Sequence, residues 1–228
     1  MAKHTLWSDE YWLLLIQLYL KKPVGVKALY SREMVELALE LHIPPQFLYE
    51  QMFRLRQLKE PKLELLWERY AARPRLLSRG VQLLRQMKGF GQAADFYDGV
   101  AVQESFERDF RPIKESGTEG GKGLLMPVHL IMILDLYFRL TPSTMQAETP
   151  EVVELSRLLR LPVSTVVEVM EVFQFCDPIL RRDEFTIHPL LEACQEVWDR
   201  YGNGRPELPW QPGLLAAEAA QMKNYFVS

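Results

Sequence analysis

The stretch SREMVELALELHIPPQFLYEQMFRLRQL, residues 31–58, has the pattern of one helix, a short turn and a second helix. Nearly the same pattern returns without a gap at residues 149–176, TPEVVELSRLLRLPVSTVVEVMEVFQFC, so the offset from 31 to 149 is 118 residues. Self-similarity at a fixed offset is typical of a duplicated structural unit. The identical pairs include Leu18 and Leu136, Tyr19 and Tyr137, Glu33 and Glu151, Val35 and Val153, Glu36 and Glu154, Leu37 and Leu155, Leu41 and Leu159, Pro44 and Pro162, Glu50 and Glu168, and Met52 and Met170.

The match extends upstream, where LLIQLYLK (14–21) aligns with MILDLYFR (132–139). In the second copy three signals mark a helix start: Thr149 suits the N-cap, Pro150 the first helical position, and Glu151 the positive end of the helix dipole. We therefore predict an all-α fold with two homologous helix plus helix–turn–helix repeats and a helical middle segment. Apolar spacing and proline breaks predict further helices at about 62–72, 75–88, 189–201 and 213–226.

The predicted organisation has five segments. The polar, Gly-rich ESGTEGGKG reads as a flexible linker, and we place the domain boundary there. We expect the two repeats to pack against each other with pseudo-twofold symmetry, because each alone is too small to bury its apolar faces. The segments are repeat 1 at 1–60, a basic helical middle segment at 61–114, the linker at 115–123, repeat 2 at 124–178, and a C-terminal helical extension at 179–228.

The composition is that of an ordinary globular protein, since 48% of the 228 residues are hydrophobic and 25% are charged. The most apolar stretch, Leu124–Phe138, contains His129 and Asp135 and is too short to span a bilayer, so it predicts a buried core helix. The N-terminus lacks the apolar run of a secretion signal. Two cysteines do not make a disulfide framework or a metal site. These features predict a cytoplasmic protein that does not bind a membrane.

The chain shows no pattern of a catalytic centre or cofactor site. Its four histidines are scattered, and its glycine pairs do not follow a strand as a phosphate-binding loop would require. The acidic pairs Glu33–Glu36 and Glu151–Glu154 lie near the starts of predicted helices, where the helix dipole stabilises them without any catalytic role. We therefore predict a non-enzymatic protein that binds no cofactor, no metal and no small-molecule substrate.

One combination of residues resembles a known family. The pattern comprises Trp7, Ser8, Leu18, Tyr19, Glu33, Val35, Glu36, Leu37, Leu41 and Pro61, and in the second copy Leu136, Tyr137, Pro150, Glu151, Val152, Val153, Glu154, Leu155, Leu159, Asp177 and Pro178. Over about 50 residues in each copy it is similar to the helical N-terminal module of bacterial HNH-family restriction-type nucleases. The nuclease itself is absent, so the resemblance implies only the module's role near DNA. The tandem form also resembles an uncharacterised bacterial family, which adds no function.

A DNA-binding interpretation depends on the helix pair and on the basic residues that follow it. Residues 54–92 hold ten Lys or Arg against three Glu. The turn position, usually glycine in DNA-binding helix pairs, is His42 or Arg160. Alternatively, the basic side chains are solvated or paired with glutamates at helical spacing, or they dock on the acidic repeats of the same or a partner chain. The predicted DNA or phosphate contacts are Gln46, Arg54, Arg56, Lys59, Arg69, Arg73, Arg75, Arg79, Arg85 and Lys88.

A protein-interface interpretation depends on apolar residues on the outward faces of the second helices. The predicted interface residues are Tyr49, Phe53, Val163 and Val167. The outward face of the second copy would also repel phosphates, because it carries glutamates. We predict a protein-interaction or regulatory scaffold that binds a protein partner or itself. The alternative prediction is a DNA-associated, transcription-regulator-like protein that contacts phosphates through residues 54–88.

Overall fold

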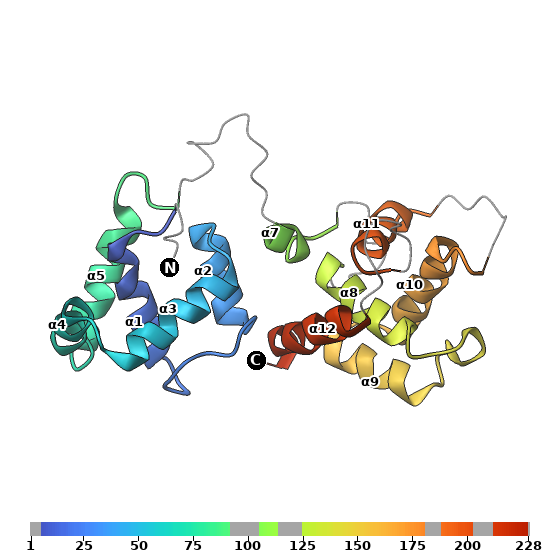
Figure 1. The fold of residues 1–228 in the computed structure, drawn as a ribbon, viewed down its shortest axis with the longest axis horizontal. Helices are drawn as coiled ribbons and strands as arrows, with labels where there is room; N and C mark the ends of the chain where they lie inside the picture. The colour runs from blue at the N-terminus through green and yellow to red at the C-terminus, as the bar shows by residue number, and fades with distance from the viewer. Residues whose placement is uncertain (1–5, 92–104, 114–124, 181–187, 203–211, 228) are drawn as a thin grey trace. The chain divides into compact units, whose positions relative to one another are not determined.

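The structure is a computed structural model that describes residues 6–91, 105–113, 125–180, 188–202 and 212–227 (Figure 1). These residues form eleven α-helices and two 3₁₀ helices, and they contain no strand, so the predicted all-α class is confirmed. The chain divides into two compact units, which we call unit 1 (1–107) and unit 2 (108–227).

The described part of unit 1 contains five α-helices and one 3₁₀ helix, and two of them match the helices predicted at about 62–72 and 75–88. The helix α7 (Ser105–Asp109) crosses the division between the units. In order, the elements of unit 1 are η1 (Asp9–Tyr11), α1 (Trp12–Leu20), α2 (Arg32–Leu41), α3 (Pro45–Gln57), α4 (Pro61–Tyr70) and α5 (Pro74–Gln86).

Unit 2 also contains five α-helices and one 3₁₀ helix in the part of the chain that is described. They are α8 (Pro127–Tyr137), η2 (Pro142–Thr144), α9 (Pro150–Leu159), α10 (Val163–Cys176), α11 (Leu191–Tyr201) and α12 (Pro212–Val227). The predicted linker at 115–123 lies outside the described residues.

The core of unit 1 forms around α1. This helix packs against α3, α4 and α5, and it buries Trp12, Leu15 and Ile16. The helix α4 contributes Leu63 to this core. The helix α5 contributes Leu77, Val81 and Leu84. From the sequence we predicted 61–114 as a segment of its own. The structure places α4 and α5 within unit 1, where both helices contact α1 and each other.

The core of unit 2 forms around α8, which packs against α9, α10, α11 and α12. Nine of its eleven residues are buried, so the apolar run is a core helix, as predicted. At its C-terminal end the Tyr137 ring packs with the rings of Phe173 on α10 and Trp198 on α11. The centroid distances are 5.8 Å for Tyr137 and Trp198, 6.1 Å for Tyr137 and Phe173, and 6.3 Å for Phe173 and Trp198. Edge and tilted ring contacts of this kind stabilise the fold beyond the contribution of the apolar area that they bury.

The two helix–turn–helix segments turn in the same way. His42 and Arg160 both have left-handed backbones, with φ values of 55° and 57°. In each turn the residue that follows donates its N–H back to the helix: Ile43 to Ala38 at 3.1 Å, and Leu161 to Ser156 at 3.0 Å. This is the closing hydrogen bond of a helix C-terminus that usually ends on glycine. Non-glycine residues therefore occupy the left-handed position in both turns, at a cost in backbone energy.

Candidate functional site

Unit 1 has a groove of about 550 Å³ between α1, α2 and α5. All three helices contribute apolar residues to its lining. Charged residues lie among them on α2 and α5 and just after α1. The lining residues are Leu14, Gln17, Leu18, Leu20, Lys21, Glu33, Glu36, Leu37, Glu40, Pro74, Leu77, Ser78 and Arg85. We call it groove 1.

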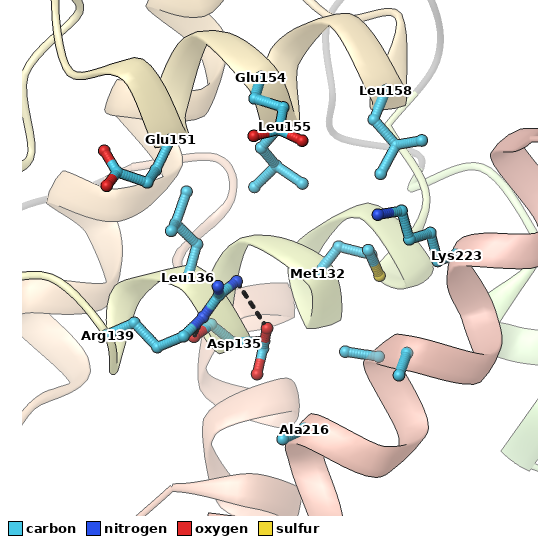
Figure 2. A pocket seen from close by; sticks show the side chains of 12 residues that line it. Met132, Asp135, Leu136, Arg139, Glu151, Glu154, Leu155, Leu158, Ala216 and Lys223 are labelled. Carbon is cyan, nitrogen blue, oxygen red and sulfur yellow. Dashed lines mark hydrogen bonds and ion pairs between the residues drawn. The ribbon is translucent and has the colours of Figure 1, made fainter.

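Unit 2 has a groove of about 350 Å³ between α8, α9 and α12, which we call groove 2 (Figure 2). Figure 2 shows Glu151 and Glu154 on α9, facing Asp135 on α8 and Arg139 just after it. The helix α12 forms the remaining wall with small side chains and one lysine. The lining residues are Met132, Asp135, Leu136, Arg139, Glu151, Glu154, Leu155, Leu158, Ala216, Ala219, Ala220 and Lys223.

The two grooves lie at the same place in their units. All eight lining residues that α8 and α9 supply to groove 2 have a counterpart in groove 1 at an offset of 118 residues. Both grooves therefore place carboxylates, a basic residue and apolar side chains at the same helical positions. The pairs are Leu14 and Met132, Gln17 and Asp135, Leu18 and Leu136, Lys21 and Arg139, Glu33 and Glu151, Glu36 and Glu154, Leu37 and Leu155, and Glu40 and Leu158.

In groove 1 most of the charged groups already have partners. Lys21 Nζ lies 3.3 Å from Glu33 Oε1. Burial opposes the ionisation of Glu33, but hydrogen bonds from its own backbone and from Lys21, together with the positive charges of Lys21 and Lys27, outweigh burial, so the pKa of this carboxyl is lowered. Arg85 of α5 binds Glu40 of α2 with two hydrogen bonds, Nε to Oε1 at 2.5 Å and Nη2 to Oε2 at 2.8 Å. Glu36 is exposed and has no ion pair with any described residue.

In groove 2 the carboxylates of α9 are less neutralised. Glu151 and Glu154 are exposed, and neither forms an ion pair within the described part of the chain. Arg139 Nη2 instead binds Asp135 Oδ2 of its own helix at 2.9 Å. Groove 2 therefore presents the two exposed carboxyl groups of Glu151 and Glu154 along its α9 edge, with Lys223 on the opposite side (Figure 2).

Four of the residues predicted to contact DNA make polar or ring contacts within unit 1. Gln46 donates to the hydroxyl of Tyr30. Arg54 binds Gln51 Oε1 at 2.9 Å and the carboxylate of Glu60, and its guanidinium lies 5.9 Å from the Trp12 ring. Arg69 lies 5.7 Å from the Tyr70 ring, and Arg85 binds Glu40 as described above. The other six are exposed and form no ion pair with described residues: Arg56, Lys59, Arg73, Arg75, Arg79 and Lys88.

The predicted interface residues lie on the outward faces of the second helices. The rings of Tyr49 and Phe53 on α3 meet edge to face with centroids 5.0 Å apart, and Phe53 is 37% exposed. Val163 and Val167 on α10 are half-buried. A mutual contact of these four residues stays a prediction.

The same outward faces carry acidic side chains. Glu50 on α3 and both Glu168 and Glu171 on α10 are exposed. Glu168 Oε1 lies 3.2 Å from Nε2 of His188, whereas no described residue forms an ion pair with Glu50 or Glu171. A helix that enters a DNA groove in this orientation would bring carboxylates toward phosphates.

The grooves were not predicted from the sequence. We assigned Glu33, Glu36, Glu151 and Glu154 to helix starts alone, and the repetition of two acids at one offset was the available signal. The missing information was the position of α5 and α12, because each groove exists only where these helices close it.

Comparison with known proteins found no matching family model, no similar curated protein and no similar solved structure. Among the described residues, no helix has the length and apolar character needed to cross a membrane. The same residues contain no group of three or more His, Cys, Asp or Glu side chains placed to hold a metal ion.

Proposed function

We propose that this chain is a protein-interaction module made of two homologous units. Each unit has a central helix, a helix–turn–helix segment and a closing helix that together form a groove. The observation that carries the proposal is the pair of grooves at equivalent positions, where six of the eight paired lining residues agree in chemical character. The identical left-handed turns at His42 and Arg160 support the homology of the units.

The proposal favours protein partners over DNA because of the charge on the second helices. Base reading needs Arg, Lys, Asn or Gln on the helix that enters the groove, and DNA affinity needs positive charge around it. In α10 that face holds Glu168 and Glu171 instead. Residues 108–228 contain twelve Lys or Arg and seventeen Asp or Glu, so unit 2 is acidic as a whole.

We expect selection from a display library of random peptides to yield ligands for the full chain. The matched control is the double variant Ser78→Arg and Ala220→Arg, which puts a long charged side chain into each groove from an exposed position. Peptides selected on the wild type should lose at least about tenfold in affinity for this variant. Failure to select any peptide, or equal binding to the variant, would contradict the proposed function.

A second candidate function is favoured by one observation: Arg73, Arg75 and Arg79 are exposed and form no ion pair with described residues. Such side chains could contact phosphates. We expect fluorescence anisotropy to detect no binding of a random DNA duplex at physiological salt. Salt-sensitive binding that disappears when all three arginines become alanine would instead support the DNA-associated function.

A further inference from the structure

The helix α5 carries an apolar stripe on its exposed side. Leu76 and Leu83, seven residues or two turns apart, are 39% and 55% exposed, and Met87 at the helix end is 58% exposed. This stripe is separate from the buried stripe of the same helix, which faces α1. Large apolar side chains grouped in this way are typical of a contact surface.

Basic residues border the stripe. Arg75 and Arg79 are four residues apart, so their side chains extend from one edge of α5. Both are exposed, and neither forms an ion pair with a described residue. The exposed side of α5 is therefore a basic amphipathic helix surface, with two arginines beside leucines.

Groove 2 has the complementary properties. Met132, Leu136 and Leu155 and the Asp135–Arg139 ion pair line it between the edges, and its α9 edge carries the two carboxylates that lack ion pairs with described residues, Glu151 and Glu154 (Figure 2). On the α12 edge three of the four lining residues are alanines, which leave room for a helix to approach. An apolar groove with one acidic edge matches an amphipathic helix with one basic edge.

We infer that groove 2 of one copy of this chain binds the exposed side of α5 of a second copy. Leu76 and Leu83 would contact the apolar residues that line groove 2, and Arg75 and Arg79 would lie against Glu151 and Glu154. The inference rests on the proposed function, and it names the partner as the chain itself, because both complementary surfaces are present in one sequence.

In groove 1 the α5 helix of the same unit neutralises one carboxylate of α2. Arg85, on the last turn of α5, binds Glu40 of α2 with two hydrogen bonds at 2.5 and 2.8 Å. Position 40 corresponds to Leu158 in groove 2, where no such internal pair exists. Groove 2 has two α9 carboxylates without an ion pair among the described residues, Glu151 and Glu154, whereas groove 1 has only Glu36, so we assign the second copy to groove 2.

Sedimentation velocity of the full chain over a wide range of concentration tests this inference. We expect the wild type to self-associate. Two charge-reversed variants, Arg75→Glu/Arg79→Glu and Glu151→Lys/Glu154→Lys, should each lose at least about tenfold in association constant, because each brings like charges together. A mixture of the two variants should associate again, because every α5 then finds a groove of opposite charge.

Glu36→Lys provides the matched control, since Glu36 occupies in groove 1 the position that Glu154 has in groove 2. This variant should associate like the wild type. Far-ultraviolet circular dichroism establishes that each variant is folded, and all five positions are exposed. A monomeric wild type, variants that associate unchanged, or a mixture that stays monomeric would overturn the inference. Peptide ligands that still bind the grooves of a monomeric chain would leave the proposed function in place.

Discussion

Replacing Arg200 by methionine is expected to lower the free energy of unfolding of unit 2 by about 3–5 kcal/mol. Arg200 on α11 binds Asp109 with two hydrogen bonds, Nη1 to Oδ1 at 2.6 Å and Nη2 to Oδ2 at 2.9 Å. The Asp109 side chain is only 3% exposed, so the substitution leaves a buried carboxylate without its cation. Removing one member of a buried pair is costly because the charge that remains is neither hydrated nor neutralised.

The measurement is hydrogen–deuterium exchange of the α8 amides in urea, because these amides report the opening of unit 2 alone. The double variant Asp109→Leu and Arg200→Met is the control. It removes both charges, and we expect it to be more stable than Arg200→Met. Equal losses in the two variants would show that side-chain packing, rather than the uncompensated carboxylate, explains the effect.

Unit 2 is also expected to lose about 3 kcal/mol of stability as the pH falls from 6.5 toward 4. His129 is buried in the first turn of α8, with its ring 5.2 Å from that of Phe226, and its Nδ1 accepts a hydrogen bond from the Met126 N–H at 2.9 Å. Burial lowers the pKa of this imidazole from 6.5 to about 4. Between these values the unfolded chain binds a proton that the folded unit does not, so acid favours unfolding.

The test compares the wild type with His129→Gln, which has no titrating ring at this position. The free energy of unfolding of the wild type, followed by the same α8 amides, should fall more steeply between pH 6.5 and pH 4 than that of the variant. Carboxylates that titrate near the lower end of this range are the same in both proteins and cancel in the comparison. Parallel pH profiles would show that His129 is not the group that titrates.

The helices were predictable because their signals are local. Prolines at the first helical position of α4, α5 and α9 and apolar residues at helical spacing depend on a few neighbouring residues only. The short helix α7 was not predicted, since five residues are too few to show a period. Its Asp109 is held by Arg200, which is 91 residues away in the chain.

The all-α class, the apolar core helix α8 and the internal similarity at an offset of 118 residues could be inferred from the residues alone. The membership of α4 and α5 in unit 1, and the closing of one groove in each unit by α5 and α12, became visible in the folded chain. The reason is physical. Helix formation follows from hydrogen bonds and side-chain spacing within a few turns, whereas a groove depends on which distant helix covers an apolar face.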